Sequence, residues 1–137
     1  LKKMNVNLKM ISDGDISGAI YVVNKKSPVD MYIGIGGGPE GVLAAAALSC
    51  YGAQMQTRLV LNEDEANRAS KMGIIDLKKK YKINEMIKGD VIFCATAITN
   101  GELINGINKE SDFLITSTMA MHKSKNINKT VINKHPK

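Results

Sequence analysis

The segment 31–48, MYIGIGGGPEGVLAAAAL, constrains the fold of this chain more than any other stretch. An apolar run closed by glycine predicts a short buried strand over residues 29–36. Pro39, an acid beside it, an alanine-rich body and Gly52 at the end predict a helix over residues 39–51. The segment therefore predicts a strand, a glycine-rich turn and a helix in direct succession.

The rest of the chain alternates between strand and helix patterns. Strands are expected at residues 6–11, 54–61, 90–99 and 112–124, and helices at residues 16–23, 63–73 and, as one or two short pieces, within 76–90. This alternation over short links predicts a single α/β domain with a mostly parallel sheet flanked by helices. Residues 1–122 are assigned to this α/β portion, and the Lys- and Asn-rich tail, residues 123–137, is expected to fray.

The composition argues against a nucleic-acid partner. The chain has 137 residues and a net charge of +6, and its excess of lysine favours anionic ligands, phosphate esters more than nucleic acid. Aromatic residues make up only 4% of the chain, so few side chains can stack on bases. RNA binding is the least favoured function, because the basic residues cluster in the tail without aromatic residues between them.

The cysteines and the hydropathy pattern indicate a compartment. Cys50 and Cys94 are isolated in largely apolar contexts, which suits a reducing environment, and His122 and His135 are expected at the surface. No apolar run approaches the roughly 18 residues that span a bilayer, and the first residues lack the core of a signal peptide. We expect a cytoplasmic protein with no membrane partner, and the leucine at position 1 predicts that the chain is cut from a longer one.

The glycines of the turn have a familiar spacing. Gly36, Gly38 and Gly41 satisfy G-x-G-x-x-G between a predicted strand and a predicted helix, which is typical of dinucleotide-binding turns. Acids at residues 63–65 follow about 20 residues later, where such folds place the acid that binds a ribose. A Rossmann-like oxidoreductase domain is therefore the alternative function for this chain.

Two neighbouring residues count against a pyrophosphate at this turn. Pro39 removes an amide from the turn, and Glu40 brings a negative charge to the helix end that should receive the phosphate. A carboxylate beside a phosphate is tolerable when a divalent cation lies between them, so Glu40 is a candidate ligand in a metal-assisted phosphoryl site. The alternative is that Glu40 only complements the helix dipole.

A second acidic motif, SDGD, spans residues 12–15. Asp13 and Asp15 flank Gly14 at the end of a predicted strand, where short acids commonly meet cations or sugar hydroxyls. An Asp-Gly turn, with Asp15 capping the next helix, explains the same residues locally. In a parallel sheet both acidic motifs lie at one edge, which would let them converge on one ligand.

Four segments of the chain resemble a known enzyme family. They read MISDGD, GIGGGPEGVLAAAAL, GDVIFCATAITNG and SDFLITSTMAMHKSKNI, in this order. In residues and spacing they are similar to the class II (GlpX-type) fructose-1,6-bisphosphatases, which include the fructose/sedoheptulose bisphosphatases of photosynthetic bacteria. The resemblance covers nearly the whole chain, and its GGxPEGVLAAAA segment is quite specific.

The resemblance implies the layered α/β sugar-phosphatase fold, of which this chain would be the C-terminal portion. It implies hydrolysis of the C1 phosphate of fructose 1,6-bisphosphate to fructose 6-phosphate and phosphate in gluconeogenesis, with Mn²⁺ or Mg²⁺ as cofactor. Glu40 matches a metal ligand and Gly37 a position whose backbone contacts the substrate. Asp13, Gly14 and Asp15 match a segment that holds the sugar phosphate.

Some features depart from the family pattern. Gly38 stands where the family usually has alanine, and Ala97 and Asn100 replace a glycine and an aspartate, so no binding role is carried over to their loop. The N-terminal half of the family supplies the other acidic ligands and a basic phosphate-binding segment, and the catalytic residues are expected there. We therefore expect this chain to be inactive alone and its full-length parent to be a phosphatase, with a homo-oligomer left open.

Overall fold

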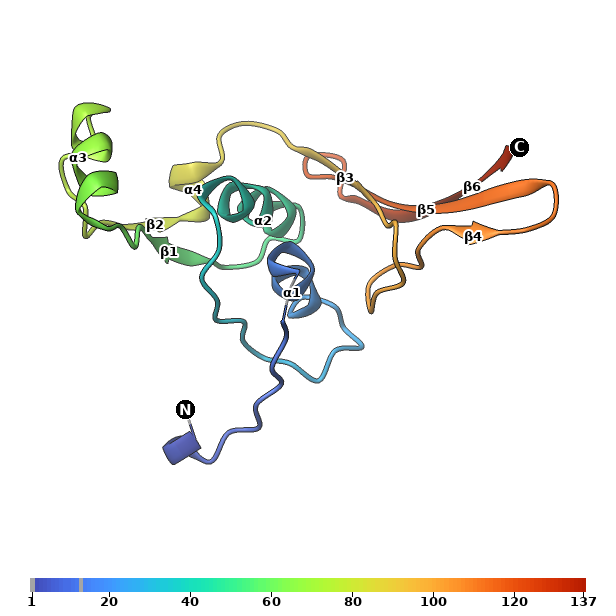
Figure 1. The fold of residues 1–137 in the computed structure, drawn as a ribbon, viewed down its shortest axis with the longest axis horizontal. Helices are drawn as coiled ribbons and strands as arrows, with labels where there is room; N and C mark the ends of the chain where they lie inside the picture. Colours follow the sequence, from blue (N-terminus) through green and yellow to red (C-terminus); the bar gives the residue numbers. More distant parts are fainter. Residues whose placement is uncertain (1, 13) are drawn as a thin grey trace.

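The computed structural model describes residues 2–12 and 14–137. In chain order its elements are η1 (Lys2–Met4), α1 (Asp15–Tyr21), α2 (Gly38–Cys50), β1 (Gln56–Arg58), α3 (Glu63–Lys71), β2 (Lys80–Lys82), α4 (Ile83–Met86), β3 (Ile92–Thr96), β4 (Asn108–Lys109), β5 (Phe113–His122) and β6 (Ile127–Pro136). Helices α1 and α2 lie together at the centre, and β5 and β6 extend beyond them as a long ribbon (Figure 1). The described part of the chain is therefore a mixed α/β fold with an open outline.

The strands form two sheets, and every pair among the described residues is antiparallel. Strand β1 pairs with β2, and β5 pairs with β3 and β4 along one edge and with β6 along the other. The mostly parallel sheet that the sequence predicts is therefore wrong. The reason lies in the links, because β5 and β6 are joined by residues 123–126 alone, and parallel neighbours need a crossover of roughly a dozen residues.

Helix α2 confirms the strongest prediction from the sequence. Gly37 is its N-cap, Pro39 lies in its first turn, and Gly52 follows its end with φ of 64°. Three of its four alanines are buried, and Ala47 joins a core with Ile20 of α1 and three sheet residues, Phe93, Met119 and Met121. Because alanine side chains are short, α2 packs close to both α1 and the sheet.

The end of the chain is ordered as a strand, so the frayed tail expected from composition is wrong for residues 127–136. Strand β6 pairs with β5 from Ile127 opposite His122 to Pro136 opposite Phe113. The Lys and Asn side chains of β6 are exposed, whereas Val131 is half-buried. A hairpin partner therefore orders a segment whose polar composition, taken alone, is typical of a mobile tail.

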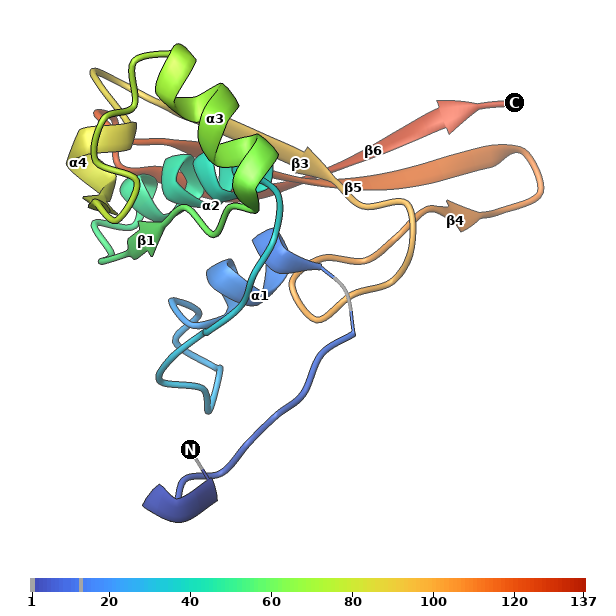
Figure 2. The same ribbon diagram turned by 60° about the vertical axis from the view of Figure 1, so that its left-hand side comes forward.

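The middle of the chain follows the sequence in part. Helix α3 confirms the helix predicted at residues 63–73, while residues 80–82, expected as helix, form β2 opposite β1. The strands predicted at residues 6–11 and 29–36 are wrong, because the described residues form no strand there. Figure 2 shows the first of these segments leading from η1 toward α1. Across the described residues, no helix combines the length and the apolar character needed to cross a bilayer.

Candidate functional site

The carboxylate of Glu40 lies against the glycine loop that leads into α2. Glu40 lies in the first turn of α2, and its side chain folds back onto Gly37, so that a Cβ at Gly37 would overlap the carboxylate. Glu40 is exposed. Its charge suits the positive end of the helix dipole, and its oxygens remain open to a ligand from outside.

The second carboxylate reaches the same loop from α1. Asp15 is the first residue of α1, and a Cβ at Gly36 would overlap its carboxylate. The hydroxyl of Tyr32 donates to Asp15 Oδ1 at 3.0 Å. Burial raises the pKa of Tyr32 above its usual value, and the adjacent Asp15 carboxylate raises it further. Tyr32 therefore stays protonated and donates a hydrogen bond to Asp15, a role that the sequence did not reveal.

Gly14 shapes the entry into α1. It is the N-cap residue, with φ of 89°, a conformation in which glycine is favoured. Its carbonyl accepts a hydrogen bond from the hydroxyl of Ser17 at 2.7 Å and one from the N–H of Gly18 at 2.8 Å. The expectation that Asp15 caps the helix is therefore wrong, because Asp15 is already helical. Asp13 lies outside the described residues.

The structure thus brings Asp15 and Glu40, from separate motifs, to consecutive glycines of one loop. Carboxylate oxygens are the donors that Mg²⁺ and Mn²⁺ prefer, so both residues fit a hard divalent cation. The described residues contain no group of three or more His, Cys, Asp and Glu side chains placed to hold a metal ion. The described part of the chain therefore offers part of a donor set. The same two negative charges disfavour a dinucleotide pyrophosphate at Gly36, Gly38 and Gly41.

A second polar cluster joins the start of β3 to the end of β5. His122 Nε2 lies 2.6 Å from Asp90 Oδ2, and Ser124 donates to Asp90 through its N–H at 2.9 Å and its hydroxyl at 2.6 Å. Hydrogen bonds from Ser124 and then from His122 hold the pKa of Asp90 below its usual value. A hydrolytic triad needs the acid and the serine on opposite ring nitrogens, but here both meet Nε2, so the cluster is a structural clamp.

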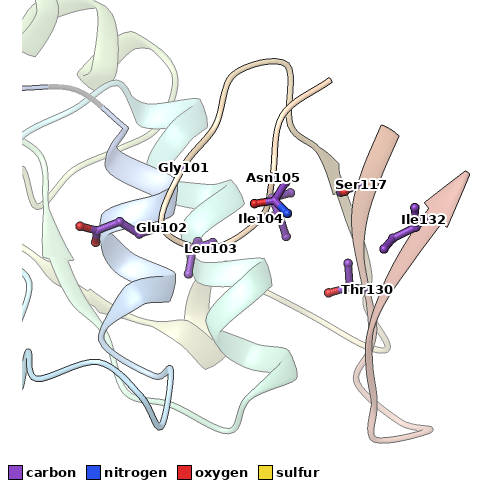
Figure 3. Close-up of a pocket in the computed structure, with 8 residues that line it drawn as sticks. All are labelled: Gly101, Glu102, Leu103, Ile104, Asn105, Ser117, Thr130 and Ile132. Atoms are coloured by element: carbon purple, nitrogen blue, oxygen red, sulfur yellow. The ribbon is translucent and has the colours of Figure 1, made fainter. Parts of the chain in front are cut away.

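A shallow pocket of about 260 Å³ lies beside the ribbon of β5 and β6. It is lined by the loop residues 101–105 and by Ser117, Thr130 and Ile132 (Figure 3). Glu102, the acid among them, turns its carboxylate away from Ser117 and Ile132 and pairs with Lys9. None of the lining residues belongs to the glycine loop, so this pocket is separate from the carboxylate site.

The loop before β4 is closed on itself. Asn100 accepts a hydrogen bond from the N–H of Gly106 through Oδ1 at 2.9 Å, and Ala97 donates its N–H to the carbonyl of Ser117 at 3.3 Å. A Cβ at Gly106 would overlap the backbone of the same loop. Asn100 therefore serves the fold of the loop through its side-chain oxygen.

Comparison with known proteins assigns the chain to a family. The family model described as bacterial fructose-1,6-bisphosphatase, glpX-encoded, matches residues 1–135. Among curated proteins, the chain is 31% identical to fructose-1,6-bisphosphatase 2 class 2 of Escherichia coli (strain K12), over 85% of this chain and 41% of that protein. It is 31% identical to fructose-1,6-bisphosphatase class 2 of Haemophilus influenzae, over 94% and 43%.

A cyanobacterial relative is also similar. The D-fructose 1,6-bisphosphatase class 2/sedoheptulose 1,7-bisphosphatase of Synechococcus sp. is 34% identical, over 78% of this chain and 35% of that protein. The chain therefore spans about two-fifths of the length of the relatives that it matches. Because the family model covers all but the last residues, the chain belongs to the bacterial, glpX-encoded fructose-1,6-bisphosphatase family.

Proposed function

We propose that this chain supplies part of the active site of a metal-dependent phosphatase that hydrolyses the C1 phosphate of fructose 1,6-bisphosphate. The observation that carries the proposal is that two carboxylates, Asp15 and Glu40, lie against consecutive glycines of the loop before α2. The names of the three relatives support the substrate. The products are fructose 6-phosphate and phosphate, as in gluconeogenesis.

Each residue of the loop has a distinct task in this proposal. Glu40 is a ligand for Mn²⁺ or Mg²⁺, which when bound neutralises phosphoryl oxygens and activates water. Gly37 presents its backbone to the substrate, and the segment Asp13, Gly14 and Asp15 holds the sugar phosphate. Tyr32 fixes the orientation of Asp15 through the hydrogen bond at 3.0 Å. A divalent cation between the carboxylates and the phosphate would offset the repulsion between their negative charges.

In this proposal, the remaining metal ligands and the catalytic residues lie in the part of the family sequence that this chain does not match. Among the described residues, no three His, Cys, Asp or Glu side chains lie together so as to hold a metal ion. The chain alone is therefore inactive in this proposal. We place the reaction in the cytoplasm, which the free thiols of the half-buried Cys50 and the exposed Cys94 support because free thiols persist in reducing compartments.

A chimera tests the proposed function. In it, residues 1–137 replace the matched portion of the Escherichia coli relative, and phosphate release from fructose 1,6-bisphosphate is measured with Mn²⁺. We expect activity from the chimera and none from the chain alone. Robust turnover by the chain alone would contradict the proposal of a partial site.

The variant Glu40→Gln in the chimera separates a metal ligand from a dipole effect. It should lower kcat/KM by about 100-fold, the upper end of what partners of metal ligands cost. The matched control is Glu63→Gln, because Glu63 also lies in the first turn of a helix. Equal activity of both variants would show that Glu40 only complements the dipole.

A further inference from the structure

Residues 29–35 form no strand among the described residues, and their side chains differ in how far they are covered. Tyr32 packs against the core cluster of Ala19, Ala44 and Leu48 from helices α1 and α2. Its neighbours Met31 and Ile33 are 70% and 66% exposed, and side chains alternate between the faces of extended backbone. The segment therefore presents an apolar face to the helices through Tyr32 and a second apolar face to solvent.

Residues 6–11 repeat this arrangement. Lys9 faces the protein, where it pairs with Glu102 and lies over the ring of Tyr21. The residues on either side of it, Leu8 and Met10, are 44% and 86% exposed. A Cβ on Gly18 of α1 would overlap both Ile11 and Tyr32, so the two segments approach the same helix. We call residues 6–11 and 29–35, where the sequence predicts strands but the structure shows none, the open strands.

The accessible surface is too large for a finished domain of this size. It measures 10558 Å² for a mass of 14.9 kDa. A folded monomer of that mass exposes roughly 7,000 Å². A standard protein interface buries only about 800 Å² on each partner. The excess is therefore several times what one standard contact covers.

We propose that the open strands are an interface for the portion of the family sequence that this chain does not match, joined to it in one polypeptide. That portion would pair its strands with the free backbone edges and cover the solvent-facing apolar side chains. The family relatives support this occupant, since the chain spans only 41% and 43% of two of them. The inference goes beyond the proposed reaction, because packing requires neither metal nor substrate.

A second copy of the chain fits this surface less well. Two copies would still represent only the same two-fifths of the family sequence, and each would bring its own pair of open strands with outward-facing Met31 and Ile33. Self-association is therefore an alternative outcome that the experiment has to detect.

Hydrogen–deuterium exchange in the chain and in the chimera tests the interface. We expect the amides of residues 6–11 and 29–35 to exchange at least about tenfold more slowly in the chimera, whereas those of α3 stay unchanged. Equal exchange in both proteins would overturn the proposal. Slow exchange in the chain alone, together with a dimer in sedimentation, would also overturn it, because a second copy would then cover the strands.

A charge on the exposed face provides an independent readout. Ile33→Asp should lower the melting temperature of the chimera by about 5 °C or more and leave that of the chain unchanged, because the introduced carboxylate would be buried only in the chimera. Ile75→Asp is the matched control, since Ile75 is 94% exposed and lies outside the open strands. Ile33→Val should retain the wild-type melting temperature. A chimera that tolerates Ile33→Asp as well as Ile75→Asp would refute the interface.

The two proposals fail separately. A chimera with protected open strands but no phosphate release would refute the proposed function and leave the interface standing. Phosphate release by a chimera whose open strands remain unprotected would do the reverse.

Discussion

Gly36 and Gly37 are free of side chains because two carboxylates occupy the space that a Cβ would need. Asp15 lies against the first glycine and Glu40 against the second, and Tyr32 holds Asp15 through a hydrogen bond of 3.0 Å. Gly38, the next residue, has nothing within 4 Å of its Cβ position. At the scale of single residues, a side chain at Gly36 or Gly37 would displace a carboxylate of the site, whereas one at Gly38 would not.

Gly37→Ala should displace the Glu40 carboxylate without unfolding the protein. Gly37 has φ of −67° and ψ of 154°, which alanine adopts without strain, and the overlapping group is the end of a flexible side chain. We expect phosphate release by the chimera to fall about tenfold or more, with an unchanged melting temperature. Gly38→Ala is the control and should retain activity. Equal losses in the two variants would argue against a role for the Glu40 position.

The Asp90 clamp predicts a dependence of stability on pH. Its folded pKa is lowered from the usual 3.8, so its contribution is fully present above that value and is lost as the pH falls through the lowered pKa. Asp90→Asn should reduce the melting temperature by several degrees at neutral pH, because it removes a charged acceptor from His122 and Ser124. The difference from wild type, followed by circular dichroism, should shrink toward about pH 2.

The exposed Asp30 provides the control for this titration. Asp30→Asn should leave the melting temperature unchanged across the same range. A gap between wild type and Asp90→Asn that stays constant down to the lowest pH would contradict the assignment of the clamp.

At the scale of elements, local caps and distant partners contribute differently. Helix α3 begins with a capping box, in which the Asn62 side chain accepts from the N–H of Glu65 and the Glu65 side chain accepts from the N–H of Asn62. Only Ala69 of this helix is buried, so α3 depends on its own ends. Strand β6, in contrast, depends on β5 along its whole length.

Asn62→Ala should loosen α3 alone. Loss of an N-cap costs about 1 kcal/mol, which corresponds to amide exchange about fivefold faster in this helix. Hydrogen exchange should leave the β5 amides unchanged, because α3 packs little against the sheet. Asn67→Ala, an exposed substitution within the same helix, is the control and should not accelerate exchange. Faster exchange throughout the chain would show that α3 is not an independent unit.

At the scale of the whole molecule, the accessible surface of 10558 Å² exceeds the roughly 7,000 Å² expected for this mass. Apolar side chains contribute to the excess along the open strands and on α2, where Val42 and Leu43 are about half exposed, at 47% and 48%. Exposed apolar surface of this extent marks an interaction site.

The dye ANS, which binds exposed apolar surface, should measure this excess directly. We expect stronger ANS fluorescence per mole from the chain than from the chimera, although the chimera is larger. Far-UV circular dichroism of the chain serves as the control that it is folded. Equal or stronger fluorescence from the chimera would contradict the view that its additional sequence covers the apolar surface.

Local signals in the chain were enough to predict several of its elements. Helices α2 and α3 and strands β3 and β5 follow from caps, glycines and apolar periodicity, which depend on residues a few positions apart. The family segments likewise indicated Glu40 and the SDGD motif. The antiparallel pairing, the order of β6, the role of Tyr32 and the Asp90 clamp became evident only in three dimensions. These depend on contacts between residues far apart in the chain, such as Asp90 with Ser124, and neither residue type nor local spacing encodes such contacts.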